Sequence, residues 1–559
     1  MSYKFPGIVS VFLFAAVLFG CKKNNDVPDN TPAPFQPVTF KFGSDSTTIT
    51  VDNSVQIIKN MPRSIDAKQL AAAVVLPAGY SISPNPSTVQ DYTNGITYTV
   101  TNSNGKTYTV QVTVLAYNAV SNPYGIYTPK HLSDIRNGLN DSYVLMNDMQ
   151  LPDLTAANAA SSVGISDYNQ YGWFSIGSRY VNGAHVIFRG SLDGQNHVIK
   201  NFTSAYRPSG NPQPTGIDPG RNGKSTDGLF GNAISATFKN IGIQLSSAGI
   251  KDFFAEGESY GYVGSLVGLA DSSTITNCYV TGNAIISAGQ YFGGLIGGVR
   301  NSTISKCYAA LTAPTGNYTL TSGSTGGGLI GTAFNSTISD SYASCSITGG
   351  VDIGGFIGIA NTCTIKTCYA SGNVGEMPYN AFGSLIAPNI LGGFIGTISS
   401  VSPATTVIEN CYALGDVTGA NGANNDFHKG TRMGGLIGQI SNVSGSISVK
   451  YCYAAGHVTR VWTSASSPFL TGALAGNTPN GVFITSAVCT NYWDKTTTGQ
   501  TNLGGGNETL AQDNGFTANG KTTVEMKTKA TYINWDFSSV WDVVSGTNNG
   551  YPFLRTVIK

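Results

Sequence analysis

Residues 354–374 read GGFIGIANTCTIKTCYASGNV, and both halves of this stretch recur along the chain. A glycine-leucine string of the GGFIG type occurs eight times, at residues 227–231, 264–268, 293–297, 327–331, 354–358, 392–396, 434–438 and 472–476. A second string of the form I-x-x-C-Y-A occurs six times, at residues 275–280, 304–309, 338–343, 365–370, 408–413 and 449–454. Such self-similarity indicates a repeat architecture, in which each unit buries its apolar face by stacking on its neighbours.

The alternation of side chains predicts the type of repeat. In CYALGDVT (411–418), Cys, Ala, Gly and Val fall on one face and Tyr, Leu, Asp and Thr on the other, because successive side chains of a strand point to opposite faces. We expect the small apolar side chains to point inward and Tyr with the polar groups to point outward. The sequence therefore predicts an all-β fold whose main part, residues 227–490, is a right-handed parallel β-solenoid.

The charge content fits this architecture. The chain of 559 residues has 31 Lys and Arg against 30 Asp and Glu, a net charge of +1, and 11% of its residues are charged. This balance excludes the basic surface of a nucleic-acid-binding protein, and a hydrophobic content of 41% excludes a disordered chain. Low charge is also what stacked coils require, because equal charges in successive coils would repel each other.

The N-terminus has the plan of an export signal. Residues 1–20 hold one Lys, an apolar run and a small residue before Cys21, as a secretory signal peptide does. The segment LFGC (18–21) resembles the bacterial lipobox, which implies that Cys21 carries the lipid anchor. An ordinary signal peptide with an incidental Cys is the alternative. Residues 21–36 then form a polar tether, and no later segment is long and apolar enough to span a membrane.

Residues 37–116 predict a small β-sandwich. The alternating runs ITYTVT (96–101) and KTYTVQVTV (106–114) flank Asn104-Gly105, a dipeptide that favours a hairpin turn. The segment resembles the Ig-like domains that follow the lipid anchor in many Bacteroidota surface lipoproteins. The resemblance implies a spacer that lifts the next domain off the membrane.

Both flanks of the array fit a solenoid. Residues 124–226 are expected to form an N-terminal cap and the first coils, beginning with a helix that has Thr128 as its N-cap and Pro129 at its first position. Residues 491–559 are expected to form a C-terminal cap, which would cover the open sheet edges at the end of the array.

The glycine-leucine strings resemble the GLUG motif of bacterial surface proteins and adhesins, which also occurs in some immunoglobulin-A-cleaving metallopeptidases. The resemblance implies adhesion to a glycan, or to a host or matrix partner, by a protein that is lipid-anchored in the outer membrane and faces the exterior. A metallopeptidase would need the sequence His-Glu-x-x-His, and none of the five His residues has that spacing.

The sequence offers no catalytic, cofactor or metal site. A glycosidase needs two facing carboxylates, whereas the acidic residues of the array repeat at no pair of positions. The eight Cys of the array lack metal-ligand spacing, and most repeat at one inward position, which favours buried thiols over disulfides. We therefore expect no enzymatic activity and no cofactor. A lyase or glycosidase, or a purely structural surface component, remain as alternatives.

The candidate ligand-binding residues are six Tyr at equivalent positions of the second string: Tyr279, Tyr308, Tyr342, Tyr369, Tyr412 and Tyr453. One hypothesis is that this amphipathic stripe packs against sugar rings or a protein partner. The other is that the rings stack for stability or lie under later insertions. We expect a monomer whose partners are the membrane, through the lipid on Cys21, and a carbohydrate or host protein, without nucleic acid.

Overall fold

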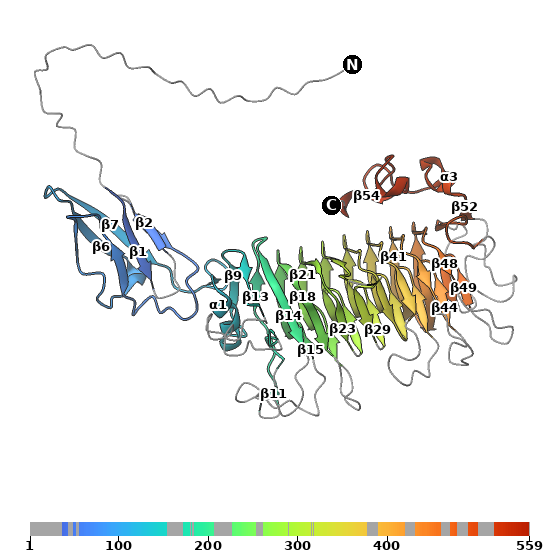
Figure 1. Cartoon of the computed structure of the whole chain (residues 1–559), viewed down its shortest axis with the longest axis horizontal. Coiled ribbons are helices and arrows are strands. Elements are labelled where there is room, and N and C mark those ends of the chain that lie inside the picture. Colours follow the sequence, from blue (N-terminus) through green and yellow to red (C-terminus); the bar gives the residue numbers. More distant parts are fainter. Residues whose placement is uncertain are drawn as a thin grey trace, which may run out of the picture.

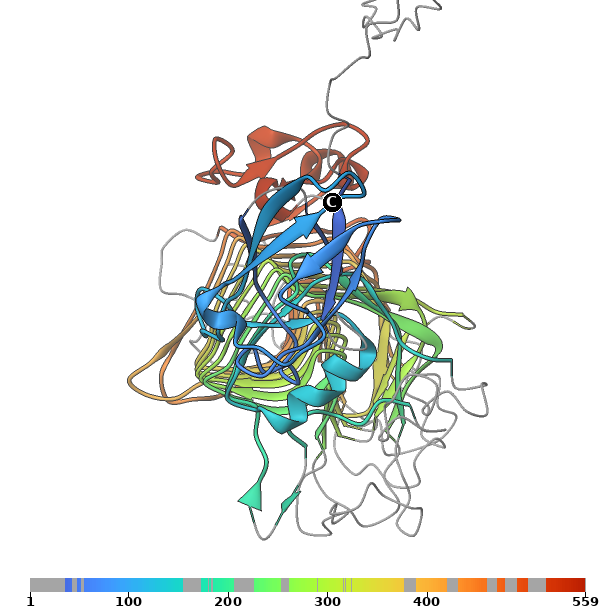
Figure 2. The ribbon, with the colours of Figure 1, turned by 90° about the vertical axis from the view of Figure 1, so that its left-hand side faces the viewer.

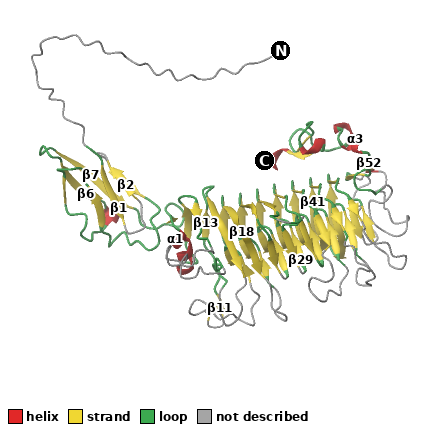
Figure 3. Ribbon diagram, in the orientation of Figure 1, coloured by secondary structure: helices red, strands yellow, loops and turns green. Residues whose placement is uncertain are grey.

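The computed structural model of the chain describes residues 36–42, 48–51, 55–153, 172–178, 180–181, 184–205, 226–252, 261–288, 290–314, 316, 318–322, 324–376, 389–419, 431–459, 470–477, 490–500 and 519–557. These residues form a small β-sandwich, an elongated solenoid and a C-terminal segment that lies along the solenoid (Figure 1). Almost all of the regular structure is strand (Figure 3). The predicted fold, a β-solenoid preceded by a small β-sandwich, is confirmed.

The sandwich consists of two sheets, with the strand orders β2-β1-β4 and β3-β7-β6-β5. Its elements are β1 (Val38–Phe42), β2 (Thr48–Val51), β3 (Val55–Ile58), β4 (Ala72–Val75), β5 (Ser81–Ser83), the 3-10 helix η1 (Tyr92–Asn94), β6 (Ile96–Thr101) and β7 (Thr107–Val114). Strands β6 and β7 form the predicted hairpin. Buried Tyr92 and Tyr98 share a hydrogen bond of 2.6 Å between their hydroxyl groups, which satisfies two polar atoms inside the apolar core.

Each coil of the solenoid crosses four parallel sheets in a fixed order. The first sheet contains β15 (Thr226–Asp227), β19 (Tyr262–Val263), β24 (Tyr291–Gly293), β29 (Thr325–Gly327), β34 (Asp352–Gly354), β39 (Ile390–Gly392), β44 (Arg432–Gly434) and β49 (Leu470–Gly472). The second contains β16 (Phe230–Ile234), β20 (Val267–Asp271), β25 (Ile296–Arg300), β30 (Ile330–Phe334), β35 (Ile357–Asn361), β40 (Ile395–Ser400), β45 (Ile437–Val443) and β50 (Ala475–Asn477). These eight rungs correspond to the eight glycine-leucine strings.

The third and fourth sheets complete the coil. The third contains β8 (Tyr124–Ile126), β9 (Ser142–Leu145), β13 (Ser191–Asp193), β17 (Thr237–Lys239), β21 (Thr274–Thr276), β26 (Thr303–Ser305), β31 (Thr337–Ser339), β36 (Thr364–Lys366), β41 (Thr405–Glu409) and β46 (Ser446–Lys450). The fourth begins with β10 (Met149–Gln150), β14 (Val198–Ala205) and β18 (Gly242–Asp252).

Beyond β18, each coil places two short strands in the fourth sheet. The strands of one column are β22 (Tyr279–Asn283), β27 (Tyr308–Thr312), β32 (Tyr342–Ala343), β37 (Tyr369–Ala370), β42 (Tyr412–Ala413), β47 (Tyr453–Ala454), β51 (Tyr492–Asp494) and β52 (Gly520–Lys521). Those of the other are β23 (Ile286–Ala288), β28 (Leu320–Ser322), β33 (Ile347–Gly349), β38 (Val374–Glu376), β43 (Val417–Thr418) and β48 (Val458–Thr459). Outside these sheets, β11 (Tyr180–Val181) pairs with β12 (Ala184–His185).

Backbone contacts explain why the first string is rich in glycine. A Cβ atom on Gly354 would lie 1.9 Å from the carbonyl oxygen of Ile357, within the turn between the first and second sheets. On Gly355 it would lie 2.1 Å from the carbonyl oxygen of the equivalent glycine in the next coil, and on Gly358 it would lie 2.7 Å from that of Gly331 in the preceding coil. Glycine therefore allows the two sheets and the neighbouring coils to approach more closely than side chains permit.

A second repeated turn leads into the fourth sheet. The residue before each Cys, or its Ser equivalent, has a left-handed backbone with φ between 50° and 56°: Asn277, Lys306, Asp340, Thr367, Asn410 and Tyr451. The first of these stacks on the coil before it, because the Asn277 amide donates a hydrogen bond of 2.9 Å to the Asn240 side-chain oxygen. Asn tolerates this conformation better than most residues do, and its amide also bonds along the stack.

A short helix lies at the N-terminal end of the solenoid. Helix α1 (Pro129–Asp134) has Thr128 as its N-cap, whose hydroxyl accepts a hydrogen bond from the backbone of His131, and it continues into the 3-10 helix η2 (Ile135–Asn137). Leu132 and Ile135 are buried in the solenoid core. Viewed along the solenoid, α1 lies across the near end (Figure 2).

The C-terminal segment follows the last strands of the fourth sheet. Strands β51 and β52 extend that sheet, and the described residues after them lie along the flank of the solenoid (Figure 1). This part contains α3 (Thr523–Met526), η7 (Lys529–Thr531), β53 (Trp541–Asp542), η8 (Asn548–Gly550), β54 (Phe553–Leu554) and η9 (Arg555–Val557). We call residues 523–557 the strap. Its aromatic side chains pack there against outward-facing Tyr residues of the coils, with which they form one apolar cluster.

Candidate binding surfaces

The six predicted Tyr residues form one continuous stack, which we call the tyrosine row. Neighbouring phenol rings are 4.7 to 5.0 Å apart between centroids, and their planes differ by 6° or less. The row arises because each Tyr begins a strand of the fourth sheet and pairs in register with the Tyr of the next coil. The structure therefore brings all six predicted side chains together.

Three of the six rings in this row are buried beside the strap. Tyr342, Tyr412 and Tyr453 keep only 6%, 3% and 0% of their surface exposed, and they belong to one apolar cluster with the aromatic residues of the strap. Trp541 contacts both Tyr412 and Tyr453, with ring centroids 6.0 and 6.1 Å apart. The hypothesis that the row binds a ligand is thus corrected for Tyr342, Tyr412 and Tyr453, because packing against the strap removes their rings from solvent.

Polar contacts tie the strap to widely separated coils. The Tyr453 hydroxyl donates a hydrogen bond of 2.7 Å to the carbonyl oxygen of Pro552. At the other end of the strap, the Thr556 hydroxyl donates one of 3.1 Å to the Asp340 carboxylate. The strap therefore reaches from the last coils of the array to its middle.

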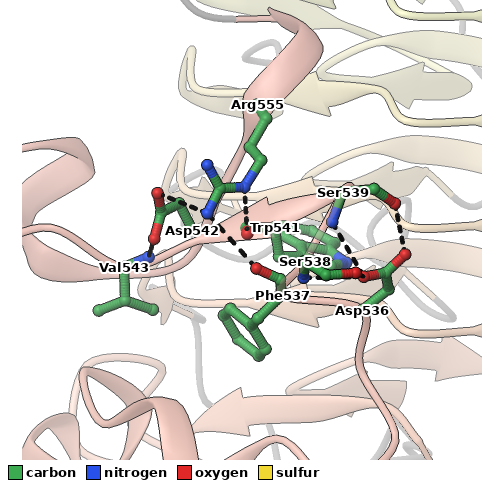
Figure 4. A network of polar contacts seen from close by, with 8 residues as sticks. All are labelled: Asp536, Phe537, Ser538, Ser539, Trp541, Asp542, Val543 and Arg555. Carbon is green, nitrogen blue, oxygen red and sulfur yellow. Dashed lines mark hydrogen bonds and ion pairs between the residues drawn. The ribbon is translucent and has the colours of Figure 1, made fainter.

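A second set of polar contacts fixes the fold of the strap itself (Figure 4). The Arg555 guanidinium forms an ion pair of 2.8 Å with Asp542 and donates a hydrogen bond of 3.0 Å to the carbonyl oxygen of Trp541. Asp536 accepts hydrogen bonds from the backbone amides of Ser538 and Ser539, at 2.8 and 3.0 Å. These contacts hold the Trp541 indole in place against the row.

Burial changes the ionisation of the covered phenols. It raises the pKa of Tyr369 to about 12. It also raises the pKa values of Tyr412 and Tyr453 well above the usual range, since burial destabilises a phenolate. The row beneath the strap is therefore held neutral by its surroundings.

The N-terminal end of the row is less covered. Tyr279 stacks on Tyr308 and leans over Gly242 in the preceding coil, where a Cβ atom would lie 2.5 Å from the Tyr279 hydroxyl. Beyond it, the Asp148 carboxylate forms an ion pair of 2.7 Å with Lys200, and the hydrogen bond from Lys200 is the main reason that the pKa of Asp148 falls to about 2. Tyr279 and Tyr308 therefore remain partly accessible members of the row.

The junction between the sandwich and the solenoid holds a cavity that the sequence analysis missed. Its volume is about 140 Å³, and its lining comes from both sides of the junction, including Met61 and Asp66 of the sandwich and Tyr124 of β8. The two sides are joined by an ion pair of 2.8 Å between Arg63 and Asp141 and by a hydrogen bond from the Gly125 amide to the Met61 carbonyl oxygen. Residues from two domains line this cavity, and no repeat in the sequence pointed to it.

The array cysteines within the described part of the chain are buried free thiols: Cys278, Cys307, Cys345, Cys363, Cys368, Cys411 and Cys452. Burial raises the pKa of Cys363 to about 11, so its thiol stays protonated and unreactive. Within the same part of the chain, no group of three or more His, Cys, Asp or Glu side chains has an arrangement that could hold a metal ion. The lipid-anchor candidate, Cys21, lies outside the described residues.

Among the described residues, no helix is long and apolar enough to cross a bilayer.

The fold is that of a repeat β-solenoid that follows a small sandwich domain. Residues 38–114 match the family described as SGBP, N-terminal, and residues 259–286 match the GLUG motif. The chain therefore combines a sandwich domain similar to the SGBP N-terminal domain with coils that include a match to the GLUG motif.

No curated protein sequence matches the chain. One similar solved structure is titled IgA1 Protease; it shares 14% identity over 82% of this chain and 28% of that chain, with a TM-score of 0.33. The chain thus spans well under half of the length of that protein.

Proposed function

We propose that this protein binds a glycan at the bacterial cell surface. The observation that carries the proposal is the match of residues 38–114 to the SGBP N-terminal domain, a family associated with surface glycan binding. The lipobox-like segment before Cys21 supports a lipid anchor in the outer membrane, with the folded part of the chain facing the exterior.

The geometry favours binding over catalysis. The sandwich and the solenoid are joined by an ion pair and a backbone hydrogen bond, so the chain can present a long surface at a fixed angle to its first domain. On the third sheet, the Thr274, Thr303 and Thr337 side chains are exposed and repeat in register. Such a regular, weakly charged surface suits a polymer better than a small substrate.

A retention experiment tests the proposal. The full chain would be run on native gels that contain one polysaccharide each, neutral glucans, mannans and galactans beside acidic polygalacturonate, with an inert marker protein as the control. Retardation in at least one gel supports glycan binding. Release of reducing or unsaturated sugars in the same mixtures would instead indicate an enzyme, and no retardation in any gel would overturn the proposal.

Adhesion to a host or matrix protein is the second candidate, and the exposed third-sheet face described above is the surface that supports it. Binding to a matrix-protein array without binding to any polysaccharide would favour this candidate. We propose that the protein acts as a monomer, since α1 covers the N-terminal end of the solenoid, where end-to-end stacking would otherwise occur. The molecular mass in solution tests this point.

A further inference from the structure

We propose that the cavity between the sandwich and the first coil binds the terminal sugar residue of a neutral glycan. The inference rests on the proposed glycan binding and assigns it a site. Both domains contribute to the walls: Met61 and Asp66 come from the sandwich, whereas Tyr117 and Tyr124 come from the connection and from the strand that opens the solenoid.

The size of the cavity determines the size of the ligand. Its volume is about 140 Å³. An engineered cavity of about 150 Å³ in another protein holds one benzene molecule, that is, one six-membered ring. Its hydroxyl groups make a pyranose larger than benzene, so the cavity, which is open to solvent, has room for at most one sugar residue and not for two. A glycan therefore enters it by a chain end, and the remainder of the polymer stays outside.

The walls can contact a sugar through aromatic rings and through polar groups. Tyr117 and Tyr124 stack with their ring centroids 4.2 Å apart and their planes 14° apart, and Tyr117 is exposed. The C–H face of a pyranose packs well on such an aromatic surface. Met61 and Leu115 extend the apolar lining. Binding sites of this composition, mostly apolar with a few polar groups, are typical of junctions between domains.

Two charged side chains at the cavity provide the polar contacts. Asp66 and Lys68 both line it and both are exposed, and the Lys68 backbone amide donates a hydrogen bond of 2.9 Å to the Asp66 carboxylate. A carboxylate accepts hydrogen bonds and an ammonium group donates them, while sugar hydroxyls do both. The two opposite charges cancel, so the site offers the carboxylate of a uronic acid no net attraction, whereas the hydroxyl groups of a neutral sugar can bond to both side chains.

The cavity is already formed before a ligand arrives. The Tyr117 hydroxyl accepts a hydrogen bond of 2.9 Å from the Ser142 amide, which holds its ring against the solenoid side of the junction. The ion pair between Arg63 and Asp141 fixes the two domains beside it. A preformed site loses less entropy on binding than one that must close around its ligand.

Competition and substitution test the site in the full chain. A polysaccharide that retards the wild-type protein is chosen first, and free glucose, galactose, mannose and galacturonic acid are then added as competitors. We expect one neutral monosaccharide to restore mobility and galacturonic acid to have no effect. Lys68→Ala should weaken retention about tenfold, since it removes a charged hydrogen-bond donor at an exposed position. Ala116→Trp, which fills the mouth of the cavity, should abolish retention.

A control variant and three further outcomes decide between the cavity and other binding sites. Lys106→Ala removes an exposed Lys from the β6–β7 turn, away from the cavity, and should leave retention unchanged. Wild-type retention that survives Lys68→Ala and Ala116→Trp would overturn the site and leave glycan binding intact. Loss of retention in Tyr279→Ala alone would place the ligand on the tyrosine row instead. A wild-type protein that no polysaccharide retards would overturn both proposals.

Discussion

The indole nitrogen of Trp541 donates a hydrogen bond of 3.1 Å to the side-chain oxygen of Asn410, although 131 positions separate the two residues in the chain. Asn410 occupies the left-handed turn that precedes a Tyr of the row, and Trp541 belongs to the strap. In a solenoid, each coil contacts only the coils beside it. The strap is thus an element that connects coils lying far apart along the axis.

Removing the indole should release the strap. Trp541 is fully buried against Tyr412 and Tyr453, and replacing a buried Trp by Ala costs about 3–5 kcal/mol. We expect Trp541→Ala to make residues 523–557 susceptible to limited proteolysis while the array stays folded. Val524→Ala is the matched control, since that side chain is 78% exposed in the same segment. Equal protease resistance in both variants would contradict the proposed role of the strap.

The raised pKa values of the buried Tyr side chains predict that the folded protein loses stability at alkaline pH. The pKa of Tyr369 is about 12 in the folded protein, whereas a Tyr in an unfolded chain titrates near pH 10, with about 1.4 kcal/mol for each unit of difference. Because the folded state holds the proton more tightly, this stabilisation is complete below pH 10 and is lost as the pH rises towards 12. The melting temperature should fall over this range. The absorbance of tyrosinate should appear at a higher pH than it does for a Tyr in an unfolded chain.

The Trp541→Ala variant serves as the comparison for this titration. Its phenols regain contact with water, so tyrosinate should appear closer to pH 10 than in the wild type. Identical titration curves for the two proteins would show that the strap does not determine the ionisation of the row.

Close contacts at the glycine-leucine string predict a strong effect of a single methyl group. A Cβ atom on Gly358 would lie 2.7 Å from the carbonyl oxygen of Gly331 and could be accommodated only by moving the backbone. We expect Gly358→Ala to lower the stability by about 1–3 kcal/mol, as overpacking does. Gly419→Ala is the control, because its nearest neighbour is the flexible end of Met433 at 3.2 Å. Equal melting temperatures for the two variants would refute this account of the string.

The proposed lipid anchor predicts the location of the protein in cells. Cys21→Ala removes the only thiol in the segment that resembles a lipobox. We expect the wild type in the outer-membrane fraction, accessible to protease added to intact cells, and the variant in soluble form. Cys363→Ala, which changes a buried thiol of the array, should leave the location unchanged. A variant that stays in the membrane would rule out Cys21 as the anchor.

The solenoid could be predicted from the sequence because the glycine-leucine string, which forms the same turn in each coil, occurs eight times. The inward Cys and the aligned Tyr are both found where alternation placed them, since a strand fixes the face of each side chain. The path of the strap could not be predicted in this way. Trp541 lies outside the repeats. Its contacts with the tyrosine row arise from tertiary packing and follow no local sequence pattern.

The same reason explains the missed cavity. Its lining joins a loop of the sandwich, which holds Asp66 and Lys68, to Tyr117 and Tyr124 in the connection. These residues form no motif in the sequence and come together only when the two domains pack. Tyr117 and Tyr124, which lie a few positions apart in the sequence, could have indicated the cavity. Aromatic residues at such spacing are, however, common in any strand-rich chain.

The position of the strap also sets the order in which the molecule is completed. Coils can form one after another as the chain emerges, because each needs only the coil before it. The rings of Tyr412 and Tyr453 nevertheless remain exposed until Trp541 and Tyr551, which follow all the coils in the sequence, have been made. A chain that stops early would possess every coil and still display an aromatic stripe that promotes association with other chains. The stripe is hidden only after the strap has been made, so residues 523–557 decide whether the coils stay apart from those of neighbouring molecules.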